Sequence, residues 1–125
     1  ARCLWIKHPD FPRAKMDLFF KWAVREAIRG GFAESRILEE HGRRMLERDF
    51  RPGGMVGTQI KDLDTALAAA AEAGVTLPLS QDVRDRFVEL RDRLGAGAYD
   101  HSALLLQLEA MAGARLTDRP DIAPA

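Results

Sequence analysis

The residue best placed to do chemistry in this sequence is Lys61, which is followed directly by Asp62. Both fall in what the sequence predicts to be the first turn of a helix, where unpaired backbone amides favour anions. A lysine at that point could form an anion site or hydrogen-bond a polar ligand. The alternative is that Lys61 and Asp62 are two solvated charges at the edge of a helix, and the residues alone favour that alternative.

The histidines indicate a functional site less strongly than Lys61 does. His8, His41 and His101 have no metal-ligand spacing, so the sequence predicts no metal site. His41 lies among charged residues and is expected at the surface. His101 follows Asp100, a predicted helix cap, and is expected to be solvated or bonded to that cap.

No residue of the chain is predicted to be catalytic. The serines fit caps or turns, and the stretch Gly95-Ala96-Gly97 lacks both the third glycine and the preceding strand of a dinucleotide-binding loop. Lys15 precedes an apolar stripe, where a surface lysine with a buried stem is a better explanation than a desolvated catalytic lysine.

Composition narrows the class of protein. The chain has 125 residues, enough for one domain with one core. Its 19 basic and 19 acidic residues balance, so no nucleic-acid partner is expected. No apolar run is long enough to span a bilayer, so no membrane partner is expected. The single cysteine, Cys3, fits a reducing compartment, and we expect a cytoplasmic protein.

Helical periodicity dominates the chain and predicts an all-α fold, a bundle of about five helices. No stretch has the alternation that is typical of a strand. The expected helices cover about 13–29, 32–46, 57–74, 80–94 and 100–111.

Short polar residues and glycines mark the expected helix ends. Thr58, Ser80 and Asp100 are predicted to be N-caps because their side-chain oxygens can accept from free backbone amides. Gly74 is predicted to close the third helix. The residues after Gly113 are expected to fray.

The helix expected at 13–29 carries more apolar surface than one buried face needs, because Leu18 and Trp22 widen its stripe. Such a surface requires a partner helix, from within the domain or from a second chain. The sequence therefore predicts a homo-oligomer that assembles through this aromatic-rich first helix.

Five blocks of sequence occur in a distinctive order and spacing: AIRGGFAES (27–35), MLERDFRPG (45–53), IKDLDTAL (60–67), LPL (77–79) and DHSA (100–103). Together these blocks resemble the C-terminal helical domain of the β-hydroxyacid dehydrogenases. The resemblance covers about 24–116. It leaves 1–23 as an unplaced N-terminal segment that begins the first helix, and 117–125 as a tail. The implied fold is an all-helical bundle like the C-terminal domain of 6-phosphogluconate dehydrogenase-type enzymes.

The resemblance implies NAD(P)-dependent hydride transfer between a small β-hydroxyacid and its aldehyde. In that family a Rossmann domain carries the nucleotide, while the helical domain closes the cleft and makes subunit contacts. The lysine of the family's Lys-Asp-Leu motif faces the cofactor near its nicotinamide end. The resemblance thus assigns a cofactor-binding role to Lys61.

The sequence departs from the family in three respects. It has no Gly-x-Gly-x-x-Gly fingerprint after a strand, Phe19 replaces the asparagine of the family's Lys-x-x-x-Asn catalytic pattern after Lys15, and Gly54 replaces an aromatic residue. We therefore expect a domain that needs a Rossmann partner, does not bind NAD or NADP tightly by itself and is inactive alone. The alternative is a stand-alone helical oligomerisation or interaction module without catalysis.

Overall fold

The computed structural model describes residues 22–125, and in this part of the chain the fold is all-α, as predicted. A helical segment at 22–28 comes first. It is followed by α2 (Arg36–Glu47), α3 (Val56–Glu72), α4 (Pro78–Leu94), the 3₁₀ helix η2 (His101–Ala103) and α5 (Leu104–Ala112). No strand occurs among these residues, only two isolated β-bridges. The expectations for Cys3, His8, Lys15 and Leu18 lie outside the described residues.

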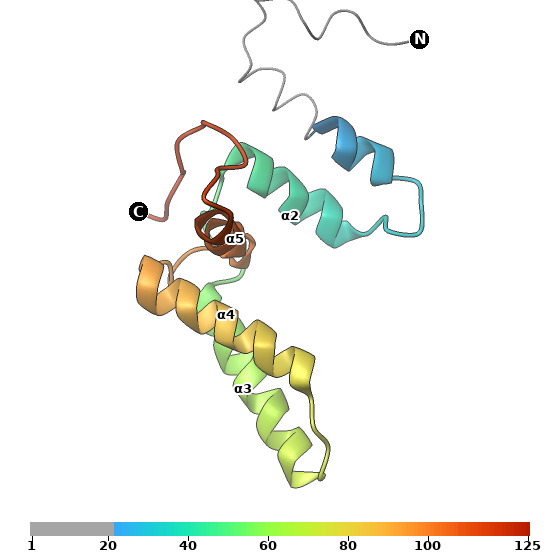
Figure 1. The fold of residues 1–125 in the computed structure, drawn as a ribbon, viewed down its shortest axis with the longest axis vertical. Coiled ribbons are helices and arrows are strands. Elements are labelled where there is room, and N and C mark those ends of the chain that lie inside the picture. The colour runs from blue at the N-terminus through green and yellow to red at the C-terminus, as the bar shows by residue number, and fades with distance from the viewer. Residues whose placement is uncertain (1–21) are drawn as a thin grey trace, which may run out of the picture.

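The helices are arranged around a long α3–α4 hairpin. The two helices lie side by side and extend away from α2, while α5 crosses near the base of the hairpin (Figure 1). α5 packs on α4, and η2 contacts both α2 and α3. The helical segment 22–28 lies beside α2, and the Arg25 guanidinium donates to the Glu39 carbonyl at 3.0 Å.

The core lies at the base of the hairpin, where loops and helices meet. Its buried residues are Phe50, Val56, Ile60, Phe87, Leu90, Ala96, Ala103 and Leu105. Beyond Ile60 no residue of α3 is fully buried, so the apolar side chains of this helix are only partly covered. The hairpin is therefore anchored at one end, and its outer half exposes much of its surface.

The start of α3 differs from the prediction that Thr58 is its N-cap. The helix begins at Val56, and the N-cap, Met55, makes no side-chain hydrogen bond. The amides of Val56 and Gly57 donate instead to the carbonyls of Tyr99 and Gly97, at 2.9 and 3.0 Å. Because a distant loop satisfies these amides, the helix starts earlier than its own sequence predicts, and Thr58 lies inside it.

The prediction of Ser80 as an N-cap is also wrong. α4 begins at Pro78, and Leu77 is its N-cap without a side-chain hydrogen bond. Proline suits a first helical position because its missing N–H would have no intrahelical partner there. The connector therefore ends at Leu77, and Ser80 belongs to the first turn.

Other helix ends follow the local sequence. The Asp100 carboxylate caps η2 by accepting from the Ser102 amide, as predicted. Gly74, just after α3, has a φ of +70°, a left-handed conformation that glycine adopts without strain. α2 begins later than expected, because Ser35 caps it by accepting from the Leu38 amide at 3.0 Å.

The C-terminal tail does not fray as expected. Ile122 exchanges backbone hydrogen bonds with the chain just after α2, accepting from the Phe50 amide at 2.9 Å and donating to the Arg48 carbonyl at 2.8 Å. Asp121 also accepts from the Arg48 guanidinium. These bonds fasten the tail to the core.

Arg48 ties α2, α5 and the tail together. Its side chain is 1% exposed and donates two hydrogen bonds to the Glu109 carboxylate, at 2.7 and 2.9 Å. Arg48 also has a φ of 57°, the one positive φ of a non-glycine residue among 22–125. Glycine is common at this position after a helix, but glycine could not supply the buried guanidinium.

Candidate functional site

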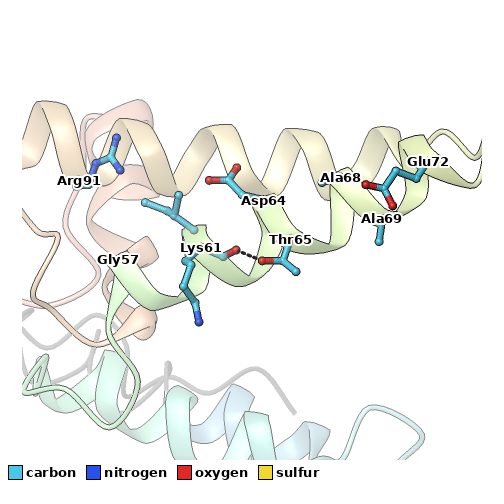
Figure 2. A pocket seen from close by; sticks show the side chains of 9 residues that line it. Gly57, Lys61, Asp64, Thr65, Ala68, Ala69, Glu72 and Arg91 are labelled. Carbon is cyan, nitrogen blue, oxygen red and sulfur yellow. Dashed lines mark hydrogen bonds between the residues drawn. The ribbon is translucent and has the colours of Figure 1, made fainter.

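Lys61 lies on an open groove that runs along α3. The groove has a volume of about 710 Å³, and its lining includes Gly57, Lys61, Asp64, Thr65 and Glu72 of α3 and Arg91 of α4. Figure 2 shows Lys61 projecting from α3 on the side away from α4, while Asp64 points toward α4. The Lys61 side chain is 72% exposed, so it is free to meet a group that approaches from outside.

The charges around Lys61 form exposed ion pairs. Lys61 Nζ lies 3.0 Å from an Asp62 carboxylate oxygen, and Asp64 pairs with Arg84 at 2.8 Å. Exposed pairs of this kind contribute little to stability, so Lys61 can exchange Asp62 for another partner at small cost.

The helix N-terminus does not add to this site in the way the sequence suggested. The Val56 and Gly57 amides are bonded to the loop that contains Gly97 and Tyr99. These two amides are therefore not available to an anion.

A second set of polar groups surrounds Asp100, which is 1% exposed. Its Oδ2 accepts from the amides of Gly53 and Gly54, at 2.9 and 3.2 Å, and its Oδ1 accepts from the Ser102 amide at 3.0 Å. Burial by itself would raise the pKa of Asp100, but these hydrogen bonds outweigh it and hold the pKa below its usual value. The carboxylate is therefore ionised and fixed in position.

The structure brings His41 and His101 together at this carboxylate, which the sequence did not predict. His41 Nδ1 lies 3.4 Å from Asp100 Oδ1, and the two imidazole rings are in edge contact with centroids 4.5 Å apart. The His41 side chain is only 19% exposed, so the expectation of a surface histidine is wrong. No sequence signal could have found this pair, because His41 belongs to α2 and His101 to η2. We call His41, Asp100 and His101 the Asp100 cluster.

The Asp100 cluster also gives a structural reason for a residue without a side chain at position 54. A Cβ at this position would lie 3.1 Å from Cε1 of the His101 ring, tighter than ordinary contact. Burial of His101 lowers the pKa of its imidazole, and this outweighs the opposite effect of the Asp100 charge. The ring of His101 thus occupies space that a larger residue at position 54 would need.

The described residues form an all-helical domain in which Lys61 is exposed over an open groove. Among 22–125, no helix is both long and apolar enough to cross a membrane.

Comparison with known proteins gives the family. A family model described as "NAD-binding of NADP-dependent 3-hydroxyisobutyrate dehydrogenase" matches residues 15–108, and the chain belongs to this family. The chain is 43% identical over 93 residues to 2-hydroxy-3-oxopropionate reductase of Escherichia coli (strain K12), covering 74% of this chain and 32% of that protein. It is 37% identical over 84 residues to a probable 3-hydroxyisobutyrate dehydrogenase-like 1, mitochondrial, of Arabidopsis thaliana, covering 67% of this chain and 25% of that protein.

The chain thus spans a third or less of the length of these relatives. The resemblance to the hydroxyacid dehydrogenases is confirmed at the level of the family. Lys61, Asp100 and both histidines of the Asp100 cluster lie within the matched residues. The role of Lys61 stays a prediction.

Proposed function

We propose that this chain is the helical substrate and dimerisation domain of an NAD(P)-dependent β-hydroxyacid dehydrogenase similar to 2-hydroxy-3-oxopropionate reductase. The observation that carries the proposal is the family match over 15–108, which includes α3 and Lys61. In this proposal Lys61 reaches from its groove to the cofactor held by a Rossmann domain, and its ammonium group donates hydrogen bonds to polar groups near the nicotinamide.

A protein of these residues alone is expected to be inactive. Hydride transfer requires a nucleotide held in a fixed position and a group that moves the proton. The sequence carries no glycine-rich fingerprint after a strand to hold the pyrophosphate. Lys61 supplies one contact to a cofactor, and one exposed contact gives weak binding.

The test is a fluorescence titration of NADPH with the chain. We expect weak, saturable binding, and we expect Lys61→Ala to lower the affinity about fivefold, since one hydrogen bond is worth about 1 kcal/mol. Arg36→Ala is the matched control, because Arg36 is a cation on α2 that is even more exposed than Lys61. Equal affinities of the wild type and Lys61→Ala would contradict the proposal.

The second candidate is a helical oligomerisation module, and one observation favours it. Large apolar side chains are exposed in the helical segment 22–28, the turn after it and α2: Val24 is 58% exposed, Ile37 is 65% exposed and Phe32 is fully exposed. An apolar surface of this kind is typical of a protein interface.

Light scattering coupled to size-exclusion chromatography tests the homo-oligomer. We expect a dimer or larger assembly that dissociates when Ile37 is replaced by serine. Leu79→Ser is the control, because Leu79 is also exposed but lies at the far end of the hairpin. A wild-type chain that stays monomeric at high concentration would contradict assembly through this surface.

A further inference from the structure

We propose that the Asp100 cluster is a binding site for a divalent transition-metal cation, of which Zn²⁺ is the type, and that the cation joins α2 to η2. Each of the three side chains offers one ligand atom, and these atoms all lie within 4.8 Å of one another. The site is distinct from the groove of Lys61, and it does not depend on the proposed function.

The spacing of His41 and Asp100 supports a shared ion. His41 Nδ1 is buried and has no hydrogen-bond partner, and it faces Asp100 Oδ1 at 3.4 Å. That separation is longer than a good hydrogen bond. It matches the distance of about 3.3 Å between two ligand atoms of a tetrahedral ion with bonds of about 2.0–2.1 Å. The competing explanation is that His41 makes only a direct polar contact with Asp100.

Asp100 has a lone pair left for an ion. Oδ2 accepts from the amides of Gly53 and Gly54, and Arg44 Nη1 lies 3.7 Å from it. Oδ1 accepts only from the Ser102 amide and faces His41. Hydrogen-bonded carboxylates of this kind are typical of metal sites, since the partners fix the ligand before the ion arrives. The nearby guanidinium opposes a second positive charge, so we expect micromolar rather than tighter affinity.

His101 is held in a similar way. Its ring packs against Gly54, and Gln59 Oε1 lies 3.4 Å from its Nδ1. An amide oxygen at that place can fix the tautomer of the ring, as outer partners of metal-binding histidines do.

The donor set selects the class of cation. Two imidazoles and one carboxylate suit Zn²⁺, Co²⁺, Ni²⁺ and Cu²⁺, whereas Mg²⁺ and Ca²⁺ prefer oxygen ligands only. Three protein ligands also leave one position open for water.

Co²⁺ is the probe, because its visible absorption reports the ligands directly. The full chain is used with Cys3→Ser, which removes the competing thiol. We expect saturable Co²⁺ absorption that Zn²⁺ abolishes and Mg²⁺ does not. His41→Gln and His101→Gln should each weaken Co²⁺ binding by at least about 10-fold. His8→Gln is the matched control, because His8 is the remaining histidine of the chain, and it should leave the affinity unchanged.

A second measurement does not depend on how well the variants fold. The sample is the chain in which no histidine has been replaced. In its NMR spectra, Co²⁺ should broaden the resonances of His41 and His101 before those of other residues. The absence of saturable binding would overturn the proposal, as would broadening centred elsewhere or affinities that neither His41→Gln nor His101→Gln changes. The direct contact between His41 and Asp100 would then be the whole role of the cluster.

Discussion

Replacing Arg48 by methionine is expected to lower the free energy of unfolding by about 3–5 kcal/mol, the usual effect of removing one partner of a buried ion pair. Arg48 and Glu109 are 1% and 9% exposed, so the variant leaves a buried carboxylate without its cation. The variant also loses the hydrogen bond to Asp121 that helps to fasten the tail. Urea denaturation followed by far-UV circular dichroism measures the change.

Two controls separate the buried ion pair from a general effect of losing an arginine. Arg36→Met removes an exposed arginine at the other end of α2, and a change within about 0.5 kcal/mol is expected. The double variant Arg48→Met, Glu109→Gln removes the unpaired charge and should recover part of the loss. A loss below about 1 kcal/mol in Arg48→Met would contradict the role assigned to this pair.

The dependence of stability on pH gives an independent readout of the same prediction. Burial alone would raise the pKa of Glu109, but hydrogen bonds from Arg48 and the Leu116 amide outweigh it and lower the pKa below its ordinary value of 4.5. In the wild type, Glu109 therefore stabilises the fold above pH 4.5, and this contribution is lost as the pH falls through the lower folded pKa. In Arg48→Met, burial should raise the pKa of Glu109, so acid should relieve the defect. The difference in stability between the two proteins should shrink as the pH falls.

Replacing Phe50 by alanine is the second change with a large expected effect, a loss of about 3–5 kcal/mol in the free energy of unfolding. Phe50 is 0% exposed and belongs to the core cluster, although it lies in a loop. Its ring stacks on Tyr99 with centroids 6.3 Å apart, and the Arg48 guanidinium lies 5.6 Å from its centroid. Alanine would leave a cavity between α2, the base of the hairpin and the tail.

Phe32→Ala is the matched control for Phe50→Ala. Phe32 is fully exposed, so its removal should change stability by no more than about 0.5 kcal/mol in the monomer. Thermal or urea denaturation of the two variants should therefore differ by several kcal/mol. Similar losses in both variants would show that the core is not centred on Phe50. Because Phe50 contacts Arg48, the losses at these two positions are not expected to add.

The sequence predicted the helices well because helical periodicity is a local property. The caps at Asp100 and the glycine after α3 were found for the same reason, since a cap depends on residues a few positions apart. The prediction failed at Thr58 and Ser80. At α3 the decisive bonds come from the carbonyls of Gly97 and Tyr99, which no local rule around Thr58 could supply.

The candidate functional residues were likewise predicted only in part from the sequence. Lys61 was singled out because its position near the start of a helix and its Lys-Asp-Leu context are visible in the sequence. Its open groove became visible only in the fold. The three residues of the Asp100 cluster looked unrelated, and His41 was expected at the surface. Only the packing of α2 against η2 places the His41 imidazole beside the Asp100 carboxylate.

By itself, therefore, the sequence determined the all-helical class, the family and the lysine that marks the groove, because these follow from short-range pattern and motif. The tertiary structure decided where α3 begins, that the tail is fastened through Arg48, and that His41 lies beside the Asp100 carboxylate. Each of these depends on a hydrogen bond or ion pair between residues far apart in the chain, whose groups meet only after the helices have packed.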